Sequence, residues 1–465
     1  MVFSSSIFLF GFLPLLLGLY FLAKDKYRNY ILLFFSLLFY GFGGPKLLIL
    51  MIILIFIDYF SAILLNSIKL KKFKKFLFIF TIILNVGVLF YFKYMGLVID
   101  IINRLASFNI PVPDIVLPIG ISFYTFQSLS YVIDVYRKEV KVQKNFFNLL
   151  LYVSMFPQLV AGPIVRYSTI DEEISKRKIT IDSFTYGFER FIFGLAKKLI
   201  IANNVGHLAD TIFGLTNLTT PIAWLGVIAY TLQIYYDFSA YSDMAIGLGK
   251  LFGFNFEENF NYPYISKSVT EFWRRWHISL STWFRDYIYI PLGGNKKGIK
   301  RQIINLFIVW CLTGIWHGAA VNFLLWGLYY FIFLMLEKFV LKKYLDKMPS
   351  FISHIYTIFI VMIGWVLFRC DGLNECMRVI KVMFNFSVNN LTNNYLLLYL
   401  EKYGLYLFLG VILSIPIFPK IRKYMVNKKN IFCHCIYYGF VFVILFLSVI
   451  FLSQASYNPF IYFRF

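Results

Sequence analysis

The sequence is short of charge. Only 15% of its 465 residues are charged, whereas about a quarter of the residues of a typical soluble domain are. Hydrophobic residues make up 60% of the chain, so there is too little polar surface to face water on all sides. Apolar runs of about 18 residues or more recur along the chain, and each can cross about 30 Å of hydrocarbon. These features exclude a soluble globular protein and predict an all-helical, polytopic membrane protein.

Several signatures of function are also missing. Five cysteines offer no CxxC pair, and Cys433-His434-Cys435 lacks the spacing of a structural zinc site, so we expect neither a disulfide framework nor a metal centre. The chain has no HExxH, G-x-S-x-G or P-loop motif and no His-x-x-x-x-Asp pattern. The first 24 residues lack a basic start and a cleavage site, and therefore favour a first membrane helix over a removed signal peptide.

Acidic residues are scarce beside basic ones. The chain has 23 Asp and Glu against 45 Lys and Arg, a formal charge of +22. The basic residues cluster between apolar runs, as at Lys69–Lys75 and Pro419–Lys429, which is the pattern of cytoplasmic loops rather than of nucleic-acid binding. The same loops would attract anionic lipid. The alternation predicts a multi-pass protein of a bacterial plasma membrane, with the N-terminus outside and the lysine-rich loops in the cytoplasm.

The apolar runs give the expected organisation. We expect about 11 spanning helices plus re-entrant or interfacial pieces. The runs lie near 3–23, 30–43, 47–65, 76–92, 115–133, 146–165, 184–205, 222–252, 303–317, 319–337, 351–369, 395–418 and 430–453. No long linker, soluble domain or two-half repeat appears, so one integrated domain over 1–465 is expected. Prolines interrupt the middle of the chain, and the stretch 230–330 is expected to line an internal cavity.

Two polar segments stand out in this apolar chain. The first, Thr270–Asn295, carries His277, and the second, Leu312–Tyr330, carries His317 between Gly314 and Gly318. Ionisable residues within a membrane are costly and usually mark a functional site. The alternative is a neutral histidine that donates to a carbonyl of a neighbouring helix. We favour function for His317 and leave both interpretations open for His277.

Other charged residues have a structural alternative. At helical spacing Trp273 and His277 would share a face, and an amphipathic helix at the cytoplasmic interface would account for the arginines of this segment. Asp237 and Asp243 are each expected either to serve the site or to pair with an arginine of 274–285. We include Asp237, Arg285, Trp316 and Asn322 among the expected substrate contacts, together with Gly314 and Gly318.

The two polar segments resemble the membrane-bound O-acyltransferase superfamily, and within it the branch of the alginate O-acetylation membrane protein. Three further pieces fit that branch: Phe156–Tyr167, Ile234–Ser266 and Asn458–Phe465. The resemblance is dense over 115–330. It implies a helical shell around a funnel that crosses the membrane, with the catalytic histidine of the family at His317 and a second polar site position at His277.

This resemblance implies an acyl transfer reaction. A thioester, expected to be acetyl-coenzyme A used as a substrate with no bound cofactor, would reach His317 from the cytoplasm, and a hydroxyl from the other face. His317 would take the hydroxyl proton, while His277 would position a substrate or polarise the thioester carbonyl. Gly314 and Gly318 would leave room for the thioester. The acceptor would be an exported or cell-surface polysaccharide, reached directly or through an extracytoplasmic partner protein.

Two alternatives remain at this stage. A relative in the same superfamily would move D-alanine from a carrier-protein thioester to teichoic acid. A transporter or lipid flippase would perform no chemistry, and it would leave the His317 motif without a purpose. The loop Gly293–Arg301 could contact coenzyme A phosphates, although anchoring on the cytoplasmic side is the favoured explanation of its charge.

Overall fold

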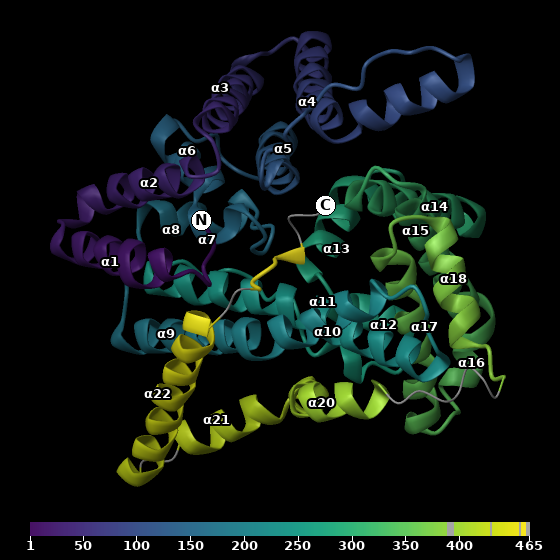
Figure 1. Cartoon of the computed structure of the whole chain (residues 1–465). Helices are drawn as coiled ribbons and strands as arrows, with labels where there is room; N and C mark the ends of the chain where they lie inside the picture. The colour runs from purple at the N-terminus through teal and green to yellow at the C-terminus, as the bar shows by residue number, and fades with distance from the viewer. Residues whose placement is uncertain (388–394, 428–429, 455–456, 462–465) are drawn as a thin grey trace. The chain divides into compact units, whose positions relative to one another are not determined.

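The computed structural model describes residues 1–387, 395–427, 430–454 and 457–461, and every regular element in these ranges is a helix (Figure 1). In the part of the chain that the structure describes, seven segments are long and apolar enough to cross a membrane: Pro45–Ser67, Lys71–Ala106, Gly298–His317, Val321–Leu345, Ser350–Arg369, Tyr395–Leu413 and Ile431–Gln454. Phe8–Leu22 is a shorter apolar helix. The all-helical, multi-pass class is therefore confirmed, whereas the expected count of about 11 spanning helices is not.

The chain forms two compact units. Unit 1 comprises Met1–Phe188 and Met244–Glu257, and unit 2 comprises Glu189–Asp243 and Glu258–Phe465. This division into units does not test the expectation of a single domain over 1–465, which stays a prediction. Both histidines of interest belong to unit 2, so that unit positions the site.

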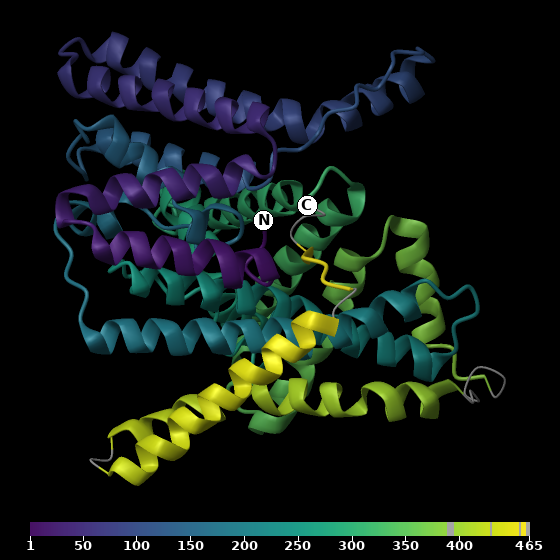
Figure 2. The ribbon, with the colours of Figure 1, turned by 60° about the vertical axis from the view of Figure 1, so that its left-hand side comes forward.

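Unit 1 is built from short and long helices around a small polar centre. Its helices are η1 (Phe8–Phe12), α1 (Leu13–Leu22), α2 (Asp25–Gly41), α3 (Pro45–Ser67), α4 (Lys71–Ala106), α5 (Ile121–Arg137), α6 (Phe146–Ser154), α7 (Phe156–Leu159) and α8 (Tyr167–Ser175), followed by the start of α9 (Ile181–Ala196). Helices α3 and α4 run side by side (Figure 2). Between them the buried Asp58 accepts from Asn85 at 2.7 Å and also from Ser128 of α5.

Two apolar runs of unit 1 fold differently from expectation. The run at 76–92 is the centre of the much longer α4, because flanking charged residues continue the helix on both sides. The run at 146–165 is not one helix: α6 ends at Ser154, and Pro157 lies in the first turn of the short α7. Proline fits a first turn but breaks a helix interior, since its nitrogen cannot donate.

Unit 2 contains the remaining helices. They are η2 (Lys197–Ala202), α10 (Asn203–Phe213), α11 (Thr220–Leu251, which ends in unit 1), η3 (Pro263–Ile265), α12 (Val269–Arg275), α13 (Ile278–Phe284), η4 (Arg285–Tyr289), α14 (Gly298–His317), α15 (Val321–Leu336), η5 (Glu337–Leu341), α16 (Lys342–Leu345), α17 (Ser350–Arg369), α18 (Leu373–Met383), α20 (Tyr395–Leu413), α21 (Ile417–Asn427) and α22 (Ile431–Gln454). Helix α14 packs against α15, and α15 packs against α17. The three helices correspond to the expected apolar runs at 303–317, 319–337 and 351–369.

Glycines bring α14 and α15 into close contact. A Cβ on Gly314 would lie 2.5 Å from the carbonyl oxygen of Phe323, and a Cβ on Gly327 would lie 2.4 Å from that of Trp310. Small residues at such a contact let two helix backbones approach, which is a common way to pack membrane helices. This contact fixes the end of α14, where His317 is the last helical residue.

Side-chain oxygens of Ser268 and Glu337 accept hydrogen bonds from the amino end of the short helix α12. Ser268 is its N-cap and accepts from the Glu271 amide at 3.0 Å. The buried carboxylate of Glu337, from η5, accepts from the amides of Val269 and Thr270 at 2.6 and 2.8 Å. Acidic groups stabilise the amino end of a helix, where amides lack partners within the helix. Glu337 thereby holds the segment that leads to His277 against the end of α15.

Candidate active site

His317 lies in an aromatic enclosure at the end of α14. The residue is 5% exposed. Its ring centroid is 4.7 Å from that of Trp316, 4.9 Å from that of Trp326 on α15 and 5.1 Å from that of Phe368 on α17. Three different segments thus hold the imidazole in place. Such an enclosure excludes water and leaves the ring in a low-dielectric surrounding, where a fixed proton acceptor acts most strongly.

The glycines beside His317 serve packing. The space next to Gly314 is filled by the α15 backbone, and a Cβ on Gly318 would overlap the Phe323 ring at 2.3–2.4 Å. The glycines thus serve the close packing of the two helices, and contact between either glycine and a thioester stays a prediction. Their absence of side chains allows α15 to lie against α14, and this places Trp326 against the imidazole.

His277 occupies a break between two helices. The spacing argument that put Trp273 and His277 on one helical face is wrong, because α12 ends at Arg275 and α13 begins at Ile278. The backbone of His277 has φ 45° and ψ 54°, a left-handed conformation that non-glycine residues adopt at a cost. His277 lies outside the seven candidate spanning helices, and its burial lowers the pKa of the imidazole to about 3, so the ring is neutral at pH 7.

Asn259 fixes the orientation of His277. The Oδ1 atom of Asn259 accepts from Nδ1 of His277 at 3.1 Å, and from the amide and hydroxyl of Ser279 at 3.2 and 2.9 Å. Its amide nitrogen donates to Ser242 at 3.0 Å. Because an amide oxygen can only accept, Nδ1 of His277 carries the hydrogen and Nε2 is the basic nitrogen of the ring.

Both histidines line one cavity of about 720 Å³. The ring of Trp316 lies between them, 6.1 Å from His277 and 4.7 Å from His317. Four exposed basic residues line the same cavity: Arg274, Arg285, Lys338 and Lys342. The acidic Glu337 and Asp346 line the cavity too, so it runs from a region of net positive charge to two buried imidazoles, an arrangement suited to a substrate with a negatively charged body and a reactive end.

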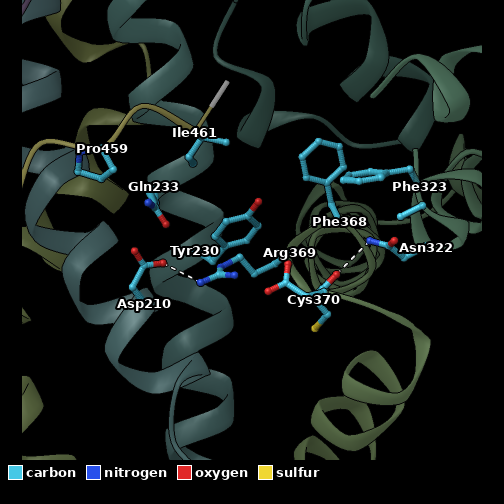
Figure 3. Close-up of a pocket in the computed structure, with 12 residues that line it drawn as sticks. Asp210, Tyr230, Gln233, Asn322, Phe323, Phe368, Arg369, Cys370, Pro459 and Ile461 are labelled. Carbon is cyan, nitrogen blue, oxygen red and sulfur yellow. Dashed lines mark hydrogen bonds and ion pairs between the residues drawn. The ribbon is translucent and has the colours of Figure 1, made fainter. Parts of the chain in front are cut away.

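A second cavity, of about 260 Å³, is lined by residues of α10, α11, α15 and α17 and by Pro459 and Ile461 (Figure 3). Phe368 lines this cavity and also contacts His317, so the same ring adjoins both. The rest of the lining includes polar side chains. Arg369 donates to Asp210 at 2.7 Å. Gln233, which is 4% exposed, points toward the other residues that line the cavity. Hydrogen-bonding groups next to aromatic rings suit a hydroxylated ligand.

Asp237 and Asp243 have partners other than those expected. Asp237 pairs with Lys198 at 2.6 Å, and Asp243 pairs with Lys197 at 2.6 Å and Arg190 at 2.8 Å. The expected pairs with arginines of 274–285 are therefore wrong. The partners come from α9 and η2, which are distant in sequence and could not be recognised from the local pattern.

The remaining expected contacts fall in different places. Arg285 lines the 720 Å³ cavity, but it is exposed and pairs with its neighbour Asp286 at 2.7 Å. Asn322 lines the 260 Å³ cavity, and its amide donates to the carbonyls of Leu367 and Cys370 at 3.2 and 3.0 Å. Its main contacts thus join α15 to the end of α17. Within the described ranges, no group of three or more His, Cys, Asp or Glu side chains could hold a metal ion.

Two residues of the site were missed from sequence. Phe368 looked like one more apolar residue of a spanning run, and nothing in its neighbourhood distinguished it. Asn259 lies within the segment Ile234–Ser266 that carries the family resemblance. The same stretch also contains Asn255 and Asn261, so residue type alone did not distinguish Asn259.

Comparison with known proteins places the chain among named relatives. The family model of the membrane-bound O-acyltransferases matches residues 32–376. The chain is 43% identical to the probable alginate O-acetylase AlgI of Pseudomonas aeruginosa over 83% of this chain and 75% of the relative. It is 39% identical to the probable alginate O-acetylase AlgI of Pseudomonas putida over the full length of both chains.

Two relatives act on other polymers, by their names. The peptidoglycan O-acetyltransferase of Helicobacter pylori is 33% identical over 82% of this chain and 80% of its own. The teichoic acid D-alanyltransferase of Bacillus subtilis is more distant, with 30% identity over 55% of this chain and 67% of its own. The family model and the full-length relatives together show that this multi-pass protein is an acyltransferase and belongs to the membrane-bound O-acyltransferase family.

Proposed function

We propose that this protein moves an acetyl group from acetyl-coenzyme A, across the membrane, toward hydroxyls of an exported or cell-surface polysaccharide. The observation that carries the proposal is the single cavity of about 720 Å³ that joins exposed basic residues to the buried His277 and His317. Coenzyme A is polyanionic at one end and carries its thioester at the other. The relatives named as O-acetylases support acetyl as the group transferred.

The proposed chemistry needs one proton acceptor. His317 takes the proton of the acceptor hydroxyl as the oxygen attacks the thioester carbonyl carbon. The carbon–sulfur bond then breaks, the acetyl ester forms, and the thiolate of coenzyme A leaves and takes up a proton. A positioned base of this kind contributes about 10²-fold to 10⁴-fold to the rate.

His277 is proposed to position the acceptor rather than to polarise the carbonyl. Its Nδ1–H is engaged by Asn259, so the neutral ring presents Nε2, which accepts hydrogen bonds and cannot donate one. A hydroxyl of the acceptor other than the attacking one can donate to such an atom, whereas a thioester carbonyl cannot. This assignment favours positioning among the two roles expected from the sequence.

The test of His317 measures acetate in living cells. Mild base should release acetate from the surface polymer of cells that carry the wild-type protein, and His317→Ala should lower the release at least about 100-fold. His354→Ala is the matched control, because His354 lies outside both cavities and its Nδ1 contacts the carbonyl of Ser266. Retained acetylation in His317→Ala, at equal protein levels, would overturn the assignment.

The same assay separates the alternatives. Release of D-alanine in place of acetate would support the teichoic acid reaction, whose named relative is more distant. Absence of any transferred acyl group with the purified protein would support a transporter. Acetate is the result that we expect.

The donor side has its own test. Neutralising Arg274, Lys338 and Lys342 together should raise the KM for acetyl-coenzyme A several-fold, because each exposed charge contributes about 0.2–1 kcal/mol. The control neutralises Lys296, Lys297, Lys300 and Arg301, which do not line the cavity. A larger KM change in the control than in the cavity variant would assign donor binding to the loop Gly293–Arg301 instead.

A further inference from the structure

The C-terminal segment Tyr457–Ile461 forms part of the wall of the 260 Å³ cavity. Pro459 and Ile461 line the cavity, opposite Phe323 and Phe368 (Figure 3). The segment has no regular helix over Tyr457–Phe460, so it depends on contacts with the rest of unit 2 for its position.

A buried ion pair holds the backbone of this segment. Lys198 of η2 and Asp237 of α11 pair at 2.6 Å, and their side chains are 5% and 3% exposed. The Lys198 ammonium also donates to the carbonyl oxygen of Pro459, and Oδ2 of Asp237 accepts from the amide of Ile461 at 2.7 Å. The two charged side chains therefore bind the peptide groups on either side of Phe460.

The segment also stabilises the ion pair, because it supplies hydrogen bonds to both buried charges. Burying two charges costs more than their attraction returns unless further hydrogen bonds satisfy the remaining atoms. Here the carbonyl of Pro459 and the amide of Ile461 supply those bonds. Recognition runs through the peptide backbone, and the ring of Phe460 adds a contact at 4.8 Å from the ring of Tyr241.

A second anchor lies at the other end of the segment. The hydroxyl of Tyr457 donates to Oδ2 of Asp210 at 2.5 Å, while Oδ1 of Asp210 accepts from Arg369. Asp210 and Arg369 both line the 260 Å³ cavity. The segment is thus attached at two points along the edge of the cavity.

We propose that the Lys198–Asp237 pair is a docking site for the protein's own C-terminal segment, and that docking completes the cavity that receives the acyl acceptor. The role given to the cavity rests on the proposed function. Lys198 and Asp237 are positioning residues, because they act through the segment and do not touch the reacting groups.

The chain contains a matched control pair. Lys197 and Asp243 come from the same two helices and pair at 2.6 Å, but in the described ranges their contacts are to each other and to Arg190, not to Tyr457–Ile461. The double variants Lys198→Gln/Asp237→Asn and Lys197→Gln/Asp243→Asn therefore carry equivalent chemical changes, and only the first removes the docking charges.

The first measurement follows docking without any assay of activity. Ile461→Cys, 7% exposed at this position, is placed in a full-length protein whose Cys311, Cys433 and Cys435 are serine, and its reaction with a maleimide is timed. Lys198→Gln/Asp237→Asn should raise the labelling rate at least about tenfold, because two hydrogen bonds to charged groups are lost. An unchanged rate, or an equal rise in the control pair, would overturn the docking site.

The second measurement follows the acceptor side. Acetate on the surface polymer should fall at least about tenfold in Lys198→Gln/Asp237→Asn, while binding of acetyl-coenzyme A by the purified protein is retained. If the variant speeds the labelling of Ile461→Cys but leaves acetylation of the surface polymer at the wild-type level, the link between docking and the cavity is overturned. Failure of the proposed function appears differently, as absence of acetyl transfer by the wild-type protein, and the labelling rates still decide the docking site.

A milder variant guards against misfolding. Tyr457→Phe keeps the buried charges and removes the hydroxyl that donates to Asp210. Labelling of Ile461→Cys should rise a few-fold, in keeping with the loss of one hydrogen bond to a charged group. No rise in this variant would contradict anchoring at this end of the segment.

Discussion

The properties of His277 follow from its immediate neighbours. Nothing in the sequence around Trp276 shows that the helix stops there, because the residues on both sides favour a continuous amphipathic helix. The structure breaks the helix, places His277 in a left-handed conformation and engages its Nδ1–H with Asn259. Residue type alone therefore indicated a site but not the orientation of the ring, which depends on a contact 18 positions away.

Asn259→Leu tests this contact. It leaves the donors of His277 and Ser279 without their acceptor, and each buried donor left unsatisfied costs about 1–3 kcal/mol. We expect a lower unfolding temperature of the purified protein, and a fall of about 10-fold to 100-fold in acetyl transfer because small displacements of positioning groups are costly.

The control for Asn259 is another buried asparagine of unit 2. Asn305 donates to the carbonyl of Gly294 at 2.9 Å and contacts neither histidine. Asn305→Leu should also lower the unfolding temperature, yet transfer per folded molecule should stay near that of the wild type. Equal loss of transfer in both variants would show that Asn259 acts through stability alone.

At the scale of helices, the pair α14–α15 was the most predictable part of the site. Two continuous apolar runs, separated at Gly318, indicated two helices with His317 at their junction, and the structure has this arrangement. The role of the glycines was not predictable, because a glycine that admits a ligand and one that admits a helix look alike in sequence. Their neighbours, Phe323 and Trp310, are revealed only by the packing.

Gly314→Ala tests the close helix contact. A Cβ 2.5 Å from the Phe323 oxygen forces the helices apart, and such overpacking typically costs about 1–3 kcal/mol. We expect a lower unfolding temperature and at least about tenfold slower transfer, since Trp326 and the His317 ring would separate.

Gly404→Ala in α20 is the matched control for that substitution, because nothing lies within 4 Å of a Cβ at this position. It should leave transfer unchanged and stabilise the helix slightly, as alanine favours helices over glycine by about 1 kcal/mol. A Gly314→Ala protein as stable and active as the Gly404→Ala protein would contradict the packing account.

At the scale of the whole molecule, composition predicted the membrane class and family motifs predicted the chemistry. The class followed from apolar length alone, which is why it was secure while the count of spans was not: the apolar runs at 184–205 and 222–252 are parts of helices that do not meet the length and composition of a membrane span. Long-range pairs such as Lys198–Asp237 were beyond prediction, since their partners are separated by 39 positions and only folding brings them together.

The central claim is that His317 acts as the base for acetyl transfer from a thioester in the 720 Å³ cavity to a hydroxyl that arrives from the other side of the membrane. Inverted membrane vesicles expose the cytoplasmic face to added radiolabelled acetyl-coenzyme A, which cannot cross the bilayer. The wild-type protein should accumulate base-labile acetate inside the vesicles, and His317→Ala should stay at least about 100-fold lower. Equal accumulation with His317→Ala, or labelled esters only on the outer face, would contradict the account.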